Sequence, residues 1–275
     1  MIELNRQKYY LLEEPLKRLK INTLFARFVI EKKVTGKIYT DNEDNPSTFY
    51  VIHPYGMSLL FGRSDNETFN SKFLDYALNK NRERKSFDMM QAFPGEWDNK
   101  LKNLFAGKLV KSGDIKKNQN DCIELSTRVN FKFNPDKYLE FKRKHIRQEF
   151  EILRTTKNDF NLMKGIVVPY YFWDNADDFC ENGAGFSLFH EGKLATVAFS
   201  AYIFDNELEL GMETIPEFRG KGFAQYACSA LIDYCLEHNY EPIWACKLEN
   251  TPSYMLAQKL GFVPHITLPY YRLAL

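Results

Sequence analysis

Residues 215–231 read "IPEFRGKGFAQYACSAL" and place Arg219, Gly220, Lys221 and Gly222 directly before a long segment with helical apolar spacing. Glycine lets the backbone come close to another group, and the first turn of a helix presents N–H donors that no helical carbonyl accepts. Those donors carry partial positive charge. The stretch is therefore typical of an anion site, most often a site for phosphate.

The segments around this stretch predict an α/β arrangement. Three strands separated by the tight-turn pairs "EG" and "DN" precede it and form an antiparallel meander; they span residues 184–190, 193–204 and 207–215. A helix is expected over 222–238, with Asn239 as its left-handed stop. A buried strand, a helix from Thr251 to Gly261 and a last strand follow; the two strands cover residues 241–248 and 269–275.

The first half of the chain also mixes helices and strands. Helical spacing occurs over 5–19, 23–31, 67–80, 95–105 and 134–148, and strand patterns occur over 34–41, 48–54, 57–63 and 121–133. A length of 275 residues favours two domains. We expect an N-terminal α/β domain over residues 1–148 and a second domain over residues 149–275.

Three phosphate-binding designs share the outline of strand, glycine-rich turn and helix. The P-loop needs GxxxxGK[ST], and the sequence contains no such string. The dinucleotide fingerprint needs a third glycine where the chain has Gln225, and it belongs to a parallel βαβ unit rather than to a meander.

Residues 219–224 of this chain read "RGKGFA". This pattern resembles the signature [Q/R]xxGx[G/A] of the GNAT superfamily of N-acetyltransferases. Members often carry NxxAxxLYxKxGF further on, and residues 250–262 read "NTPSYMLAQKLGF". The matching positions are Asn250, Leu256, Lys259, Gly261 and Phe262, with Ser253 as a small residue in place of alanine. The whole chain also resembles a two-domain subgroup of GNAT acetyltransferases from Gram-positive bacteria.

This resemblance implies a GNAT fold over roughly residues 150–275, with a mixed, splayed central sheet flanked by helices. The strands at 207–215 and 241–248 would splay apart and receive the pantetheine arm of acetyl-CoA. The smaller α/β half before them would either shape the acceptor cleft or be a degenerate GNAT-like domain. The implied acetyl-CoA contacts are Thr214, Ile215, Arg219, Gly220, Lys221, Gly222, Phe223, Ala224, Asn250 and Ser253.

The candidate catalytic groups come from the strand before the turn and from the second motif. Glu207, Glu209 and Glu213 share one face of that strand, so they either line the acceptor channel or are simply solvated. Glu213 is the first candidate for the general base and Glu209 the second. The family often uses a tyrosine acid where this chain has Ala257. Tyr254, or else Tyr270 and Tyr271 in the final strand, or water is therefore expected to protonate the thiolate.

The predicted function is transfer of an acetyl group from acetyl-CoA to a primary amine by direct attack in a ternary complex. The acceptor is a small molecule or a peptide, and the protein is a monomer or homodimer. Two alternatives remain open: a CoA-binding sensor or interaction protein without catalysis, and an acyltransferase that uses another acyl-CoA donor.

Composition excludes several other classes. A net charge of +1 gives no sign of a nucleic-acid partner. The five cysteines and five histidines show no metal-ligand spacing, so no metal is expected. Neither a signal peptide nor a membrane-length apolar run occurs, and scattered cysteines fit reduced thiols, so we expect a cytoplasmic protein without a membrane contact.

Overall fold

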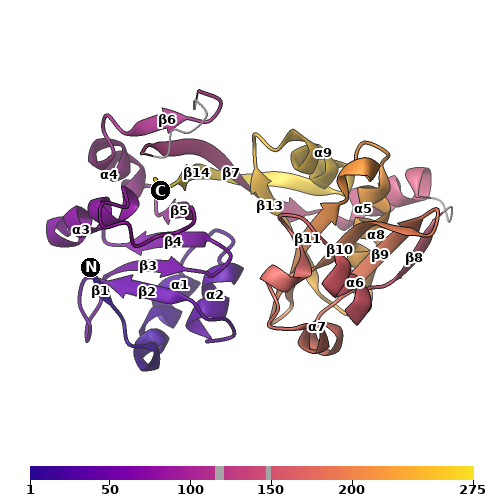
Figure 1. The fold of residues 1–275 in the computed structure, drawn as a ribbon, viewed down its shortest axis with the longest axis horizontal. Coiled ribbons are helices and arrows are strands. Elements are labelled where there is room, and N and C mark those ends of the chain that lie inside the picture. Colours follow the sequence, from indigo (N-terminus) through magenta and orange to yellow (C-terminus); the bar gives the residue numbers. More distant parts are fainter. Residues whose placement is uncertain (115–120, 147–149) are drawn as a thin grey trace. The chain divides into compact units, whose positions relative to one another are not determined.

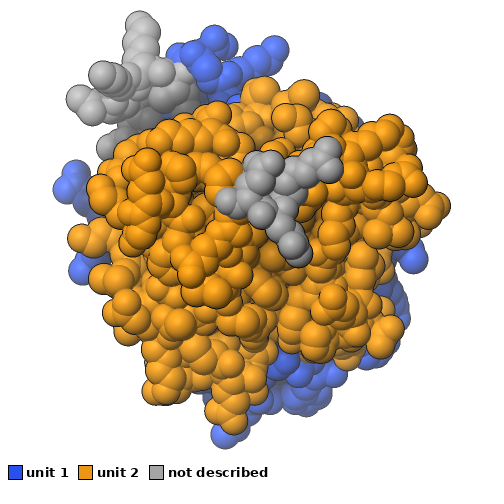
Figure 2. Space-filling model, turned by 90° about the vertical axis from the view of Figure 1, so that its right-hand side faces the viewer, with its two compact units in different colours: residues 1–129, 246–250, 266–275 blue, residues 130–245, 251–265 orange. Residues whose placement is uncertain are grey.

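The computed structural model describes residues 1–114, 121–146 and 150–275. The chain forms two compact units, the first from residues 1–129, 246–250 and 266–275 and the second from residues 130–245 and 251–265 (Figure 2). This division differs from the expected boundary after residue 148. The described residues 130–146 group with the second unit, where Tyr138 donates to the Ser229 carbonyl and the Asp233 carboxylate. The last ten residues group with the first unit because their strand pairs with residues 89–91.

The first unit is built on one sheet with helices beside it (Figure 1). The strands of this sheet are β1 (Ile2–Glu3), β2 (Lys37–Thr40), β3 (Thr48–Ile52), β4 (Met57–Gly62), β5 (Met89–Phe93), β6 (Leu109–Lys111), β7 (Ile123–Phe133), β13 (Ala245–Lys247) and β14 (Phe262–Arg272). Residues 130–133 of β7, Ala245 of β13 and residues 262–265 of β14 belong to the second unit, and the first unit holds the rest of the sheet. Its helices are η1 (Arg6–Leu12), α1 (Glu13–Lys17), α2 (Leu24–Ile30), α3 (Glu67–Ala77) and α4 (Glu96–Leu104). The order is β1-β2-β3-β4-β5-β14-β7-β13, with β6 beside β7. Strands β1, β5 and β6 were not expected from the sequence.

Large apolar side chains fill the core of the first unit. Tyr50, Phe73, Trp97, Phe105 and Tyr271 are all fully buried there. Tyr271 comes from β14, near the end of the chain, and its ring lies 5.8 Å from that of Phe105. The final strand is therefore part of this core and not an appendage to it.

A charged cluster on Glu124 joins four segments of the first unit. Arg272 Nε lies 2.8 Å from one carboxylate oxygen, while Lys247 Nζ at 3.1 Å and Ser112 Oγ at 2.7 Å donate to the other. Burial alone would raise the pKa of Glu124, but these hydrogen bonds outweigh it and lower the pKa to about 2.

The second unit holds the meander that the sequence predicts. Its strands are β8 (Glu151–Arg154), β9 (Gly185–His190), β10 (Lys193–Phe204), β11 (Glu207–Thr214) and β12 (Glu241–Ile243). The helices are α5 (Pro135–His145), α6 (Lys157–Leu162), η2 (Pro169–Tyr171), α7 (Ala176–Asn182), η3 (Pro216–Phe218), α8 (Phe223–Glu237) and α9 (Thr251–Lys259). The order is β12-β11-β10-β9-β8, and β8 to β11 are antiparallel. Glu191 and Asp205 have φ of 51° and 52°, as tight hairpin turns require.

Helix α8 covers this sheet and packs against β9, β10 and β11. Ala227, Leu231 and Cys235 recur at helical spacing and are fully buried, which accounts for the length of the helix. Burial raises the pKa of the Cys235 thiol to about 12, so this cysteine is a core residue and not a nucleophile. Asn239 has φ of 60° and confirms the predicted left-handed stop.

The strand expected over residues 241–248 is in fact two. Strand β12 pairs in parallel with β11 from Glu207↔Glu241 to Glu209↔Ile243. After Trp244 the chain forms β13, which pairs with β7 instead. Within the described residues, β11 thus continues to Thr214 beyond the end of its pairing with β12. The predicted mixed, splayed sheet is confirmed, and the prediction of one continuous strand is wrong because its second half joins another sheet.

Gly261 provides a test of the packing that holds α5 in the second unit. Its φ is +87°, and a Cβ would lie 2.7 Å from Tyr138 N and 2.8 Å from Asn134 O. Gly261→Ala should lower the free energy of unfolding by about 3 kcal/mol or more, since strain and backbone overlap add. Gly192→Ala is the matched control, with φ of +74° and no described atom within 4 Å of its Cβ. It should cost only about 1 kcal/mol in the same denaturant titration. Equal losses would contradict the packing argument.

Glu124 generates a pH prediction. Because its folded pKa lies below its ordinary value of 4.5, its stabilising effect is complete above pH 4.5 and is lost as the pH falls towards 2. Glu124→Gln should lower the free energy of unfolding at pH 7 by about 1–2 kcal/mol, a figure reduced for solvent screening. The gap between variant and wild type should narrow at pH 3 in urea denaturation. A gap that stays constant with pH would contradict the assignment.

Candidate active site

The glycine-rich turn lies between the end of β11 and the start of α8. Gly220 and Gly222 have φ of +79° and +82°, in the left-handed region that favours glycine. No described atom lies within 4 Å of a Cβ built on Gly220, and a Cβ on Gly222 meets only the side-chain amide of Gln225, at 3.5 Å. Both glycines are exposed, as is Lys221 between them. The turn therefore offers open backbone that a ligand can approach closely.

Helix α8 begins without a side-chain cap in the described part of the chain, since its N-cap residue is Gly222. Helices α3, α5, α6 and α7 differ, because Asn66, Asn134, Thr156 and Asn175 accept hydrogen bonds from their first turns. The positive end of a 15-residue helix is thus left for another acceptor. A pyrophosphate fits this turn by charge and by space.

Arg219 points back to β11. Its Nε donates to the Thr214 carbonyl at 3.0 Å, and its Nη2 lies 3.0 Å from Glu213 Oε1. Lys221 Nζ lies 5.1 Å from the centre of the Phe218 ring. Arg219, the first of the two predicted cations, therefore forms hydrogen bonds within the protein. Lys221 remains at the exposed turn.

The predicted contacts at the end of β11 and the start of α8 have distinct local roles. Ile215 N donates to the Ala195 carbonyl at 3.0 Å, so this donor continues the pairing of β11 with β10. The Thr214 hydroxyl lies 2.9 Å from that of Thr196. Phe223 is buried, with its ring 6.2 Å from Phe218, so its side chain belongs to the core. Ala224 is half-buried.

Glu213 is only 9% exposed, and three donors converge on its carboxylate. Ile166 N and Val167 N donate to Oε2 at 2.9 and 3.2 Å, and Arg219 donates to Oε1. A Cβ on Gly165 would lie 2.5 Å from Glu213 Oε2. The first candidate for the general base is thus engaged on both oxygens by its own protein.

The face of β11 that carries the glutamates is packed rather than solvated. Glu209 is 6% exposed and lies opposite Tyr202 in the register of β10 and β11. The ring of Phe172 lies 5.5 Å from that of Tyr202 and 5.5 Å from that of Phe199. The segment before α7 therefore covers this face.

Residues of the second motif lie around the start of α9. Asn250 N donates to the Lys247 carbonyl at 3.1 Å, and Ser253 is half-buried. Tyr254 is half-buried with its ring 5.5 Å from that of Phe131. Ala257 is fully buried, so the position where the family often has tyrosine belongs to the core of this unit.

No sequence motif marks residues 165–167, from which the Ile166 and Val167 N–H groups donate to Glu213. The only sequence signal is a glycine in the stretch "KGIVVP". Such a contact joins residues 46 and 47 positions apart, and no local pattern specifies it.

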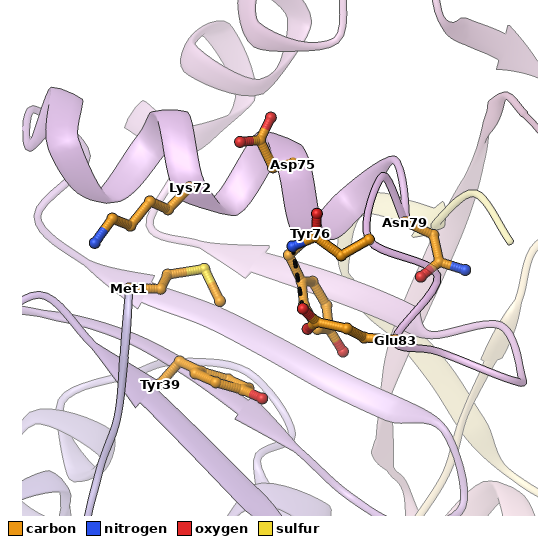
Figure 3. A pocket seen from close by; sticks show the side chains of 8 residues that line it. Met1, Tyr39, Lys72, Asp75, Tyr76, Asn79 and Glu83 are labelled. Carbon is orange, nitrogen blue, oxygen red and sulfur yellow. Dashed lines mark hydrogen bonds between the residues drawn. The ribbon is translucent and has the colours of Figure 1, made fainter.

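A pocket of about 320 Å³ lies in the first unit, and its lining residues include none from residues 219–224 or 250–262 (Figure 3). Lys72, Asp75 and Tyr76 reach it from α3 and Tyr39 from β2. Its Met1 side chain fills part of the space between them. In the described ranges there is no group of three or more metal-ligating side chains, and no helix there is long and apolar enough to cross a membrane.

Comparisons with known proteins agree with this geometry. The chain is 23% identical over 262 residues to the uncharacterized N-acetyltransferase YdfB of Bacillus subtilis (strain 168), and the match covers 94% of each chain. A GCN5-related N-acetyltransferase-like protein from Streptococcus suis 89/1591 has a similar fold, with a TM-score of 0.71, 16% identity and coverage of 98% of this chain and 100% of that one.

A tandem GNAT protein from the clavulanic acid biosynthesis pathway is similar in fold over 99% of this chain and 97% of its own, with a TM-score of 0.61 and 8% identity. The family model described as GNAT acetyltransferase matches residues 15–271, which is nearly the whole chain. The splayed strands, the open glycine turn and this match lead to one conclusion. The chain belongs to the GNAT acetyltransferase family.

Proposed function

We propose that the protein transfers the acetyl group of acetyl-CoA to a primary amine by direct attack in a ternary complex. The observation that carries the proposal is the exposed turn at Gly220 and Gly222, which leads into the uncapped start of α8. It follows directly on a strand, β11, that extends beyond its pairing with β12.

The backbone would supply most of the binding. The pyrophosphate would accept hydrogen bonds from N–H groups of residues 220–224, because Arg219 N already donates to the Pro216 carbonyl at 3.2 Å. The left-handed glycines let the pyrophosphate approach without meeting a Cβ. The pantetheine arm would lie near Thr214, along the part of β11 that pairs with β10 but extends beyond the pairing with β12. Asn250 and Ser253 would contact the arm from the side of α9. Lys221 adds charge at the exposed turn, whereas Arg219 is held by Glu213.

The reaction forms a C–N bond and breaks the C–S bond of the thioester. The attacking amine loses one proton, and the departing thiolate gains one. Because the Glu213 carboxylate is already occupied by three donors, we place the proton acceptor at Glu209. Tyr254 is our candidate proton donor to the thiolate, with water as the alternative.

The acceptor is proposed to be a small molecule or a peptide that carries a primary amine. All five cysteines are free thiols, which fits a reducing compartment, so we propose that the protein works in the cytoplasm. A monomer or a homodimer is compatible with this chemistry.

Calorimetric titration with acetyl-CoA and with desulfo-CoA tests the cofactor site. Wild type should bind both and should not bind free ATP. Gly222→Trp should weaken acetyl-CoA binding at least about 100-fold, because the side chain fills the space over the first turn of α8. Gly192→Trp is the matched control, since φ is +74° there and the position is an exposed hairpin turn. It should leave the affinity within about twofold. Tight binding by Gly222→Trp would remove the turn from the site.

Acetyl transfer is tested by CoA release from acetyl-CoA in the presence of a panel of primary amines. Release should depend on an amine. Glu209→Gln should lower kcat about 100-fold or more, as expected for a lost general base, with acetyl-CoA affinity unchanged. Unchanged kcat in this variant would exclude Glu209 as the base. Binding of acetyl-CoA without release across the panel would favour the CoA-binding sensor.

A further inference from the structure

We propose that Glu213 is a positioning residue that fastens two segments to the end of β11: the backbone of residues 165–167 and the turn that begins at Arg219. The proposal rests on the proposed function for its role in acetyl transfer. Its structural part concerns contacts within the second unit and is testable without any ligand.

The contacts of Glu213 are divided between the two segments. Oε2 accepts two consecutive N–H groups, from Ile166 at 2.9 Å and Val167 at 3.2 Å. Oε1 accepts from Arg219 Nη2 at 3.0 Å, and the same guanidinium donates from Nε to the Thr214 carbonyl. A buried carboxylate with partners on both sides joins them as a bridge, and the loss of one partner leaves a buried charge without its compensation.

Gly165 allows this arrangement because it has no side chain to collide with Glu213. An added Cβ would lie 2.5 Å from Glu213 Cγ, 2.5 Å from Oε2 and 2.6 Å from Cδ. Real Cβ atoms do not approach this closely, and Glu213 is too buried and too well bonded to move aside freely. The glycine is therefore needed so that the backbone can lie on the carboxylate. Its φ lies outside the left-handed region, so alanine would cause overlap but no backbone strain.

The fastened segment presents apolar side chains between two anchors. One anchor is Glu213, and the other is Phe172, which is buried against Phe199 and Tyr202. Between them Ile166 is 75% exposed, and Tyr170 is 44% exposed. One carboxylate thus holds the segment that carries the exposed Ile166 and Tyr170 side chains, and the proposed cofactor turn, in a fixed relation. This is what an enzyme needs to align two substrates.

A proton acceptor and a bridge predict different results for Gly165→Ala. This variant keeps the Glu213 carboxylate, so a pure general base would still work in it. A bridge would be broken by Gly165→Ala and by Glu213→Gln alike. Gly95→Ala is the matched control, because Gly95 has a helical φ of −62° and no described atom lies within 4 Å of its Cβ.

Amide hydrogen exchange on the full chain without ligand is the first experiment. Exchange at Ile166 and Val167 should be about tenfold faster or more in Gly165→Ala and in Glu213→Gln, and unchanged in Gly95→Ala. The double variant Gly165→Ala/Glu213→Gln should be no faster than the faster single variant, because both changes break one bridge. Unchanged exchange in both single variants, or additive effects in the double variant, would overturn the proposal.

Steady-state acetyl transfer as a function of pH is the second experiment. Gly165→Ala and Glu213→Gln should lower kcat by similar factors, within about threefold of each other, and both should keep the shape of the wild-type pH profile. A loss confined to Glu213→Gln, together with a lost limb of its pH profile, would make Glu213 the base and overturn the positioning role. If no variant and no wild type binds acetyl-CoA, the proposed function fails while the exchange result still decides the bridge.

Discussion

The end of pairing between β11 and β12 is the constraint on which the second unit depends. The two strands pair in parallel as far as Glu209 and Ile243, after which the chain turns at Trp244 into a strand of another sheet. A strand that continues without its neighbour exposes backbone polar groups that a sheet would satisfy. Strand β11 runs on to Thr214, and the open turn at Gly220 and Gly222 follows it. The strand that loses its neighbour therefore leads into the turn at which we propose the anion binds.

Local patterns in the sequence were sufficient to predict the elements around the turn. Hairpin residues at 191–192 and 205–206 marked the meander, and Asn239 marked the end of α8, because turn chemistry is local. The division of residues 241–248 into two strands was not predictable in this way. The apolar composition of that stretch fits a buried strand in either sheet, and only the pairing of Ala245–Lys247 with β7 decides between them.

The site shows the same limit. The glycines and the uncapped helix followed from the short motif, since the conformation and the donors belong to neighbouring residues. The hydrogen bonds of Glu213 did not follow from the motif, because two of its donors are the backbone N–H groups of Ile166 and Val167, in a segment without regular apolar spacing. Alternation along β11 predicted correctly which side chains share a face. It carried no information about what covers that face, and Phe172 covers it.

The path of β14 has a consequence for how the protein is made. In the first sheet this strand lies between β5 and β7, and its residue Tyr271 belongs to the core of that unit. The ribosome delivers this strand after the whole meander and α8. Most of the second unit can therefore form while the sheet of the first unit still has a gap between β5 and β7. The first unit closes its sheet only when β14 has been made, so its core depends on a strand that is distant in sequence from its other members.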